Sequence, residues 1–497
     1  MDFDYDVVII GAGIGGLTTG ALLGNRGLRV AIFEQGEKAG GCCQSFKREN
    51  LTFDAGAHIS WGFENAGSHD KVLSDLHLAL QGIKLDPLYQ VILPNHRLDI
   101  FDAYDKFLAE VGREFPSEIH IIDVFSTKLK ELEEFFYNLT LDKFAIPPKG
   151  LSNKFEHLKF FLQNLRKSSY VKKVTNELLT KINISSEVKT MLDAQVFYFT
   201  QKNLTDSPAL LASFFLSLRK HGLYYIQGTT QALVSILLRS LNKNNVKIFY
   251  KSKVKEIIFK NKKAIGLKIN DITDVSSRYI ISNTTLWDLY GYLIKPEIQK
   301  PGLKRLLLNH PPEWAPISLY LGVEEGILPS PINEHLFIIK DYNCPLFDTN
   351  LAFISISPKW DNIRAPNGKR AITATCLLPI KKWEEELSNT NYTTLKEKKT
   401  NEMINTLESV ITFLKEGIVF KDLATPSTFN RYTLRKQGVI GGIEQLTTDF
   451  KRKYLSNYTP YKNVFVVGDN TLPGKGTSFV SQSALNLADI ITRLEKK

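Results

Sequence analysis

The residues best suited to chemistry form a glycine turn close to the amino terminus. Gly11, Gly13 and Gly16 give the pattern G-x-G-x-x-G, between an apolar run at residues 6–10 and a helical pattern at 17–24. In such a turn the first glycine permits a tight bend, the second lets the backbone approach a pyrophosphate, and the third lets helix and strand pack closely. The amides that begin the helix then face the phosphates. The spacing therefore predicts a dinucleotide site.

An acidic residue follows this turn at a distance typical of such sites. Glu34 stands eighteen residues after Gly16, where a second apolar run at 30–33 ends. A carboxylate at this place typically accepts a hydrogen bond from a ribose 2′-hydroxyl. The turn and the strand end supply three further candidate contacts, Ile14, Gly15 and Gln35. This context favours dinucleotide binding over a chance glycine turn.

Two neighbouring cysteines come after a second glycine pair, in Gly40-Gly41-Cys42-Cys43. A disulfide between adjacent cysteines closes a small, strained ring that departs from relaxed disulfide geometry. We therefore expect two small side chains beside the cofactor, and not a dithiol that exchanges electrons with it. The chain has four cysteines in all, too few for a disulfide framework, which predicts a reducing, cytoplasmic location.

Length and composition predict a globular protein with more than one domain. The 497 residues are 43% hydrophobic and 23% charged. The net charge of +11 favours an anionic partner such as a membrane surface, and no nucleic-acid-binding module is recognisable. The longest apolar run, at residues 209–218, is shorter than the ~20 residues that span a bilayer. We expect a protein that can touch a membrane without crossing it.

A basic amphipathic stretch at residues 154–173 has two interpretations. Its apolar face carries Phe155, Leu158, Phe161, Leu162 and Leu165, with lysines and arginines around it. Such a helix can lie on an anionic membrane. It can equally face the protein core with a solvated basic side.

The remaining pattern alternates strands and helices. Residues 70–221 read as mostly helical. The sequence predicts a four-stranded meander at 246–250, 254–259, 264–269 and 279–283, strands of a second sheet at 316–324 and 351–357, and a long helix at 391–416.

Five motifs, in the same order, resemble the phytoene desaturase, carotenoid isomerase and retinol saturase family of FAD-dependent oxidoreductases. They are DVVIIGAGIGGL, GGCCQSFKRENLTFDAGAHISWGF, GLYYIQGTTQALVSILL, ATPSTFNRYT with the later Gly441-Gly442, and VVGDNTLPGKG. The resemblance implies FAD as cofactor and an apolar polyene or isoprenoid lipid as the hydrophobic small-molecule substrate. It implies desaturation, saturation or cis–trans isomerisation. The loop after Gly40-Gly41 and the carboxyl-terminal loop resemble those of carotenoid isomerases, which favours desaturation or isomerisation.

The resemblance also implies an α/β fold in which a Rossmann-type FAD-binding domain is interleaved with an α+β, partly helical substrate domain. We assign residues 1–75, 222–285 and 445–497 to the first and residues 76–221 and 286–444 to the second. Three other functions stay open: a retinol-saturase-like reductase, an amine-oxidase-like flavoenzyme, and a carrier of prenyl lipids without catalysis. The intact glycine turn, Glu34 and Asp469 argue against a carrier.

By this resemblance the carboxyl-terminal loop, with Gly468, Asp469, Gly476, Thr477 and Ser478, lies beside the flavin. Asp469 then bonds the ribityl chain or a neighbouring hydroxyl, the alternative being a helix N-cap. The family usually has glutamine where this chain has Lys475, and small apolar residues at 477–479.

Two further residues are assigned by the same resemblance. The backbone of Val254 is expected to contact the adenine, the alternative being a plain core valine. His58, after FDAGA, is a candidate proton donor, the alternative being a hydrogen-bonded structural histidine. The nine histidines show no H-x-H or H-x-x-x-H spacing, so the sequence predicts no metal site.

Overall fold

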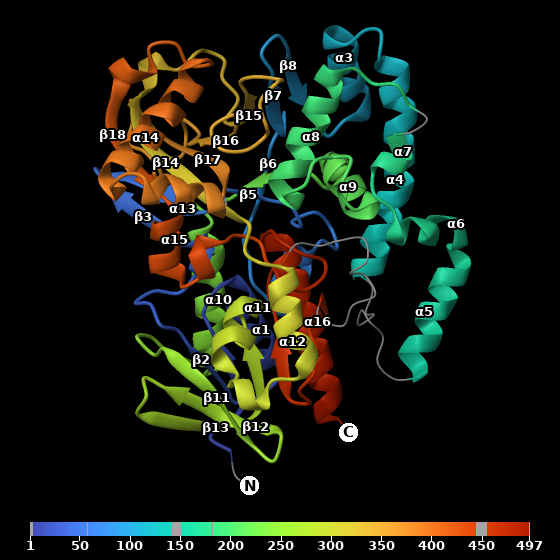
Figure 1. Cartoon of the computed structure of the whole chain (residues 1–497), viewed down its shortest axis with the longest axis vertical. Coiled ribbons are helices and arrows are strands. Elements are labelled where there is room, and N and C mark those ends of the chain that lie inside the picture. Colours follow the sequence, from blue (N-terminus) through green and yellow to red (C-terminus); the bar gives the residue numbers. More distant parts are fainter. Residues whose placement is uncertain (1–2, 57, 142–150, 180–181, 444–454, 497) are drawn as a thin grey trace.

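The computed structural model describes residues 3–56, 58–141, 151–179, 182–443 and 455–496. Two large β-sheets carry the architecture (Figure 1). One lies at the end of the molecule where both termini lie, and the other lies at the opposite end beside a layer of helices. The functional cavity described below is lined from both parts.

The first sheet joins strands that are far apart in the sequence. Its parallel strands lie in the order β10 (Lys247–Phe249), β2 (Val30–Phe33), β1 (Tyr5–Ile10), β13 (Thr273–Ser282) and β19 (Val464–Val466). The predicted strands at 6–10 and 30–33 are confirmed as β1 and β2. Both are buried apolar runs, as is typical of parallel strands covered on both faces.

Three helices cover one face of this sheet. They are α1 (Ile14–Asn25), α10 (Gln231–Lys243) and α16 (Thr477–Glu495), and α1 contacts the other two. Val7 and Ile9 of β1 pack into this layer, while Val8 and Ile10 pack on the opposite face. The strand period of two therefore divides β1 between two cores.

Two of the four predicted meander strands were wrong. The strand predicted at 246–250 is β10, which pairs in parallel with β2, and the strand predicted at 279–283 is the parallel end of β13. The antiparallel ribbon consists of β11 (Val254–Lys260), β12 (Lys263–Ile269) and the first half of β13, whose second half lies parallel between β1 and β19. Short apolar strands look alike in sequence whichever neighbour they pair with.

The second sheet has the order β18 (Ile418–Ala424), β14 (Trp314–Glu324), β17 (Lys369–Pro379), β16 (Leu351–Ile356), β15 (His335–Ile339), β7 (Tyr89–Ile92) and β8 (Arg97–Ile100). The strands predicted at 316–324 and 351–357 are confirmed as β14 and β16. The helix predicted at 391–416 is α14 (Tyr392–Glu408), which ends earlier than expected. The prediction of a helical stretch was wrong for β7 and β8, a hairpin that enters this sheet by pairing with β15.

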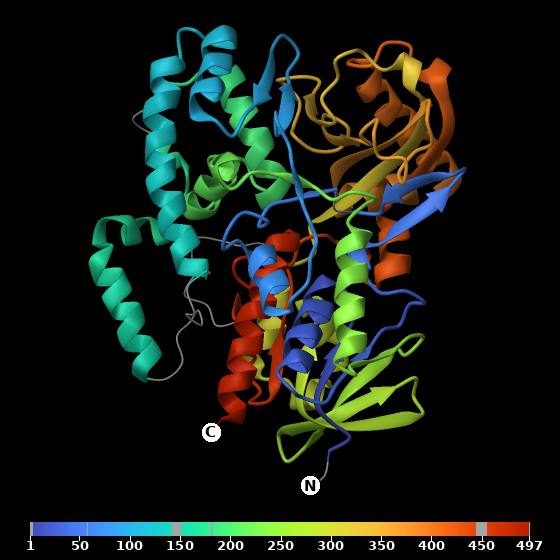
Figure 2. The same ribbon diagram turned by 180° about the vertical axis from the view of Figure 1, so that it is seen from behind.

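The helical layer contains α3 (Tyr104–Glu114), α4 (Ile119–Leu141), α5 (Leu151–Gln163), α6 (Leu165–Ser168), α7 (Asn176–Leu179), α8 (Ser186–Thr200) and α9 (Ala209–Leu216). Figures 1 and 2 show α5 standing off from the body of the molecule. Phe155, Leu158, Leu162 and Leu165 are each more than half exposed, so most of the apolar face does not point into a core. Among the residues that the structure describes, no helix is long and apolar enough to cross a membrane.

Shorter elements complete the fold. They are α2 (Ser68–Asp75), α11 (Leu286–Asp288), α12 (Pro301–Asn309), α13 (Ile380–Ser388), α15 (Pro426–Thr433), β3 (Ser45–Arg48), β4 (Leu51–Asp54), β5 (Ile59–Ser60), β6 (Ile83–Lys84) and β9 (Tyr224–Tyr225). The two-domain boundaries assigned from the sequence stay a prediction.

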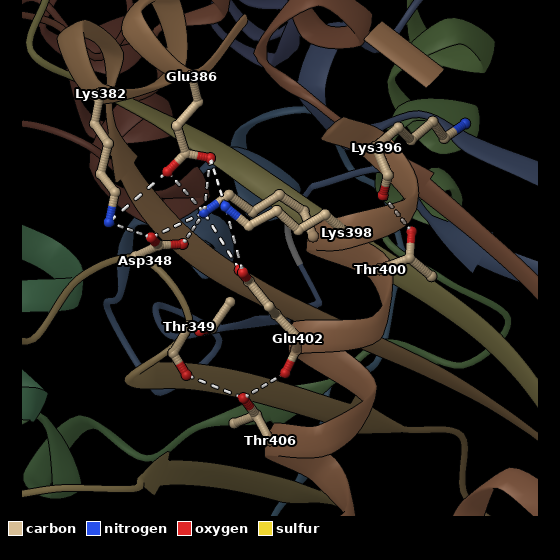
Figure 3. A network of polar contacts seen from close by, with 10 residues as sticks. Asp348, Thr349, Lys382, Glu386, Lys396, Lys398, Thr400, Glu402 and Thr406 are labelled. Atoms are coloured by element: carbon tan, nitrogen blue, oxygen red, sulfur yellow. Dashed lines mark hydrogen bonds and ion pairs between the residues drawn. The ribbon is translucent and has the colours of Figure 1, made fainter. Parts of the chain in front are cut away.

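A buried lysine of α14 joins α13 and α14 to the loop that precedes β16, and Figure 3 labels the three carboxylates around it, Asp348, Glu386 and Glu402. The Nζ atom of Lys399 on α14 lies 2.9 Å from Asp348, 3.3 Å from Glu386 on α13 and 3.3 Å from Glu402 on α14. Its side chain is 1% exposed. The carboxylates converge on the cation from three segments, so the charge is compensated within the chain.

Candidate active site

A cavity of about 620 Å³ extends from the glycine turn into the region between the second sheet and the helical layer. One end is lined by the turn, Glu34 and Val254. The other end is lined by aromatic side chains that include Phe337 of β15 and Phe353 of β16. A single space therefore joins a polar, glycine-rich end to an apolar one.

The glycine turn lies where β1 ends and α1 begins. Gly11 has φ +94°, a conformation that favours glycine. A Cβ atom on Gly16 would lie 2.2 Å from the Gly11 carbonyl oxygen, so only glycine lets helix and strand approach this closely. Gly13 and Gly15 line the cavity at the start of α1, where the first amides of a helix have no partner inside the helix and can face an anion.

Glu34 is held in place by two backbone amides. Its Oε2 accepts a hydrogen bond from the Ala12 amide at 2.8 Å, and its Oε1 accepts one from the Gly36 amide at 2.7 Å. The carboxylate thus lies beside the glycine turn at the end of β2. Each oxygen keeps a further lone pair for a ribose hydroxyl.

The second glycine pair lies directly against the first turn. Gly40 forms a bridge with Gly13, and Gly40 and Gly41 have φ +122° and +56°. Cys42 and Cys43 follow as free thiols on the cavity wall. Burial raises the pKa of both thiols, so they are protonated and poor nucleophiles.

The carboxyl-terminal loop and the segment after α15 bring two cations and a carboxylate to the cavity wall. Asp469 Oδ2 accepts a hydrogen bond from Arg435 Nη2 at 2.6 Å. Lys475 lies on the same loop and lines the cavity. Its Nζ atom is buried and has no hydrogen-bond partner within the described part of the chain. Burial lowers the pKa of Lys475 to about 7.

Aromatic rings form the far end. Phe199 and Phe215 stack at a centroid distance of 4.4 Å, and Trp61 packs edge-on against both. A Cβ atom on Gly476 would lie 2.3 Å from the Trp61 ring, so the loop that carries Lys475 leads directly to this apolar wall.

Two polar pairs lie within the apolar end. The Tyr89 hydroxyl donates a hydrogen bond to Gln195 Oε1 at 2.6 Å, and the Ser318 and Thr375 hydroxyls lie 2.9 Å apart, with Thr375 opposite Phe353. All four residues are buried and line the cavity. The other described residues at this end offer a ligand mainly rings and aliphatic groups.

Known proteins resemble this chain in sequence and in fold. Residues 9–76 match a family described as an NAD(P)-binding Rossmann-like domain. The chain is 28% identical to a protein named prolycopene isomerase, chloroplastic, of Daucus carota, over 98% of this chain and 79% of that protein. It is 23% identical to all-trans-retinol 13,14-reductase of Danio rerio, over 94% of this chain and 83% of that protein.

The chain is a homologue of the carotenoid isomerases and retinol reductases. Its fold is similar to that of an oxidoreductase from Methanosarcina mazei, with a TM-score of 0.70 at 15% identity over 97% of this chain and 99% of that one. The resemblance predicted from five motifs is confirmed, and so is the α/β fold with its Rossmann-type part. Like these homologues, the chain is an enzyme.

The residues that line the cavity fit a dinucleotide cofactor. A Cβ atom on Gly13 or Gly15 would lie 2.9 Å or 2.6 Å from the Asn283 side chain, so glycine lets this side chain pack directly against the turn. The Glu34 carboxylate, the helix start and the Asp469 carboxylate all line this one cavity. Groups suited to a ribose, a pyrophosphate and a further hydroxyl-bearing chain, the polar parts of a dinucleotide, therefore occur in one space.

Most of the residues assigned to the cofactor from sequence line the cavity, and two do not. Gly16 packs against Gly11 beneath the turn, and Ser478 lies behind Gly62. Asp469 is not the N-cap of α16, because the helix begins at Thr477 after Gly476. The contact of each of these residues with a cofactor stays a prediction.

His58 lies on the cavity wall, and its two ring nitrogens have no hydrogen-bond partner in the described residues. Burial, with the nearby charges of Arg364 and His335, lowers the pKa of His58 to about 3. The ring is therefore neutral near pH 7, and its role as a proton donor stays a prediction. No group of three or more His, Cys, Asp or Glu suited to a metal occurs in the described residues.

Sequence reasoning missed two polar residues of the site, Asn283 and Arg435, and assigned no role to a third, Lys475. Asn283 follows β13 directly, where a polar residue after an apolar strand is a usable signal. Arg435 follows one of the five motifs closely. Lys475 stood out as a departure from the family pattern, but its burial came from the fold.

Proposed function

We propose that this protein is an FAD-dependent oxidoreductase that acts on a polyene or isoprenoid lipid. The observation that carries the proposal is the single cavity that joins the glycine turn and Glu34 to an aromatic end. Bound FAD would supply hydride or electron exchange with the substrate. The chain would supply binding, orientation and exclusion of water.

The cofactor end of the cavity would hold FAD through three groups. The start of α1 faces the pyrophosphate, Glu34 accepts from the ribose, and Asp469 bonds the ribityl chain, with Arg435 holding that carboxylate in place. Cys42 and Cys43 would be small neighbours of the ring, since protonated thiols do not attack it.

The apolar end would hold the lipid between aromatic rings. Phe199, Phe215, Phe337 and Phe353 present flat faces and edges to an extended conjugated chain. The rings keep water away from the reacting bonds. The described residues that line this end carry no charged group that would bind a polar amine tightly, which favours a lipid over an amine-oxidase substrate.

Isomerisation or desaturation is the reaction that we favour, and retinol-saturase-like reduction is the second candidate. One relative is named an isomerase and another a reductase. The two classes differ in mass balance: isomerisation leaves the substrate mass unchanged, whereas desaturation and saturation remove or add two hydrogens.

The test is a comparison of lipid extracts from a host that makes acyclic polyenes, with and without this chain. A product at unchanged mass and shifted retention indicates isomerisation, and a mass change of two hydrogens indicates desaturation or saturation. The purified chain should be yellow with bound FAD. A colourless chain that cannot be reconstituted with FAD contradicts the proposal and supports a lipid carrier.

Asp469→Ala tests the cofactor end. We expect it to lose most of the bound FAD, and Asp469→Asn, which keeps the shape of the side chain, to lose less. Asp489→Ala on α16 is the matched control, because that carboxylate is partly exposed and pairs with Arg26 away from the cavity. FAD retention by Asp469→Ala equal to that of the control contradicts the assignment.

We also propose that α5 and α6 contact an anionic lipid surface, so that a cytoplasmic chain would work at the membrane periphery. Phe155, Leu158 and Leu162 are exposed on α5, next to basic residues such as Lys159 and Arg166. A helix with this pattern binds the interface through apolar contact and charge attraction.

The test is co-sedimentation with vesicles of phosphatidylcholine containing phosphatidylglycerol, against phosphatidylcholine alone. We expect binding to the anionic vesicles only, lost in the double variant Phe155→Ser, Leu158→Ser. Leu308→Ser is the control, because Leu308 is equally exposed on α12 at another place in the fold. Binding that survives the double variant contradicts the proposal.

A further inference from the structure

Lys475 is the feature of the cavity that the proposed function does not use. Its side chain lines the cavity, and its Nζ atom is buried without a hydrogen-bond partner among the described residues. Burial of an isolated ammonium is costly in free energy. Such a group therefore either loses its proton or is stabilised by an anionic ligand. The pKa of Lys475, lowered to about 7 by burial, indicates that both forms are accessible near neutral pH.

The nearest carboxylate does not compensate Lys475. Asp469 forms its close ion pair with Arg435, at 2.6 Å between Oδ2 and Nη2, and its other oxygen accepts from the Asn470 amide. The other titratable groups around this cluster are Cys42 and Asp288, the first a protonated thiol and the second a carboxyl whose pKa burial raises. The cluster therefore lacks an anion for Lys475.

The place of Lys475 along the cavity identifies the anion that could fill this gap. The loop passes from Asp469, assigned to the ribityl chain, through Lys475 to Gly476, which touches the Trp61 ring of the apolar wall. In an extended dinucleotide, the redox-active ring comes after the ribityl chain and next to the substrate. Lys475 lies in that interval.

We propose that Lys475 sets the reduction potential of the bound cofactor. Its ammonium stabilises the reduced, anionic form of the flavin and so raises that potential. Uptake of two electrons and one proton converts the neutral oxidised ring to a reduced ring with one negative charge. The electrons come from the substrate as a hydride, or from dithionite in the test. A glutamine at this position, as the family pattern has, lacks that charge.

This inference rests on the proposed function, because it requires FAD in the cavity. It makes a separate claim, which is that the charge of Lys475 and not its bulk sets the potential. Lys475→Met removes the charge and keeps an unbranched side chain, and Lys475→Gln removes the charge and keeps polarity. Lys475→Arg keeps the charge.

The control for the charge change is Lys436→Met. Lys436 is exposed and adjacent to Arg435 in the sequence, so the same charge is removed close to the site but in water. Screening by solvent should leave the potential of this variant unchanged.

The experiment is a reductive titration of the purified, FAD-loaded chain against reference dyes, with dithionite as reductant, together with a titration with sodium sulfite. Sulfite adds to the oxidised ring and leaves a negative charge on it, so its affinity reports the same stabilisation without substrate or turnover. In Lys475→Met and Lys475→Gln we expect the reduced form to be at least tenfold less favoured, which is about 30 mV for two electrons. We expect sulfite to bind at least tenfold more weakly, and both values to be retained in Lys475→Arg and Lys436→Met.

The outcomes separate the two claims. FAD-loaded Lys475→Met or Lys475→Gln with an unchanged potential and unchanged sulfite affinity overturns the role of Lys475 and leaves the flavoenzyme intact. An unmodified chain that takes up no FAD overturns the proposed function. If Lys475→Met alone loses FAD, the potential of FAD-loaded Lys475→Gln decides the question.

Discussion

Two buried lysines of this protein have opposite surroundings. Lys399 lies against three carboxylates at 2.9–3.3 Å, in a network that joins α13 and α14 to the loop before β16. Lys475 lies in the cavity with no hydrogen-bond partner within the described chain. The first cation is compensated by the fold itself, and the second is left for a ligand. A buried charge thus indicates a functional site only where the chain supplies no opposite charge to compensate it.

The pKa values of the two lysines follow from these surroundings. Burial works against the charge of both, but for Lys399 the hydrogen bond and charge of Asp348 outweigh burial and raise the pKa. For Lys475 burial dominates and the pKa falls to about 7. Lys399 is therefore charged at all ordinary pH values, whereas Lys475 can gain a proton when an anion arrives.

Acid should have the largest effect on stability, through buried groups whose pKa, like that of Lys475, is lowered by burial. Burial lowers the pKa of His58, His69 and His335 to about 3. Unfolded histidines titrate near pH 6.5, so below that pH the unfolded chain binds more protons. The free energy of unfolding should fall as the pH decreases from about 6.5 toward 3, by up to about 1.4 kcal/mol per pH unit for each histidine.

Urea unfolding at a series of pH values checks this. His335→Leu should reduce the pH slope by one proton, and His77→Gln, at an exposed position, should leave it unchanged. The network of Lys399 should add little to the pH dependence of stability above pH 4. Burial acts against the charge of Asp348, but hydrogen bonds from Lys382 and Lys399 outweigh it and lower the pKa of Asp348, so this carboxylate stays ionised there. A stability that is flat between pH 6.5 and 5 contradicts the prediction.

Removal of the compensated lysine should be the next largest effect. Lys399→Met leaves Asp348, Glu386 and Glu402 facing one another without their shared cation. We expect the free energy of unfolding to fall by about 3 kcal/mol, the low end for a broken buried ion pair, since the carboxylates keep some contact with water. Lys398→Met is the control on the same helix, because Lys398 is 57% exposed and contacts carboxylates only at 3.9 Å. Equal decreases in the free energy of unfolding of the two variants would contradict a special role for the buried, compensated lysine.

Removal of the uncompensated lysine should have the opposite sign. In the chain freed of its dinucleotide, Lys475→Met replaces a buried, unpartnered amine by an apolar side chain of similar length. We expect the free energy of unfolding at pH 7 to rise by about 1 kcal/mol. With FAD bound the gain should shrink, because the ammonium then has a role. Thermal unfolding of both forms measures this, and a clear destabilisation of the cofactor-free variant shows that Lys475 has a partner in the fold.

An exposed lysine with a partner should matter least. Lys251 and Glu37 form an ion pair at 2.8 Å, but both side chains are more than 70% exposed. Solvent and salt screen such pairs, so Lys251→Met should leave the melting temperature unchanged. A loss comparable to that of Lys399→Met would show that pairing, and not burial, governs the comparison.

The sequence by itself determined the features that depend on neighbouring residues. The glycine turn, the apolar strands β1 and β2 and the acidic Glu34 are local patterns, because a tight bend and a buried strand are specified by a few consecutive side chains. The order of five motifs also sufficed for the family, which the homologues confirmed.

Only the tertiary structure decided the features that join distant segments. β10 and the hairpin of β7 and β8 found partners far away in the chain, which strand patterns do not specify. Whether a buried lysine has a compensating carboxylate also depended on the tertiary structure. Asp348 lies 51 residues before Lys399, and Asp469 is close to Lys475 but is engaged by Arg435. Burial and compensation are properties of the surroundings, and a sequence lists side chains without their surroundings.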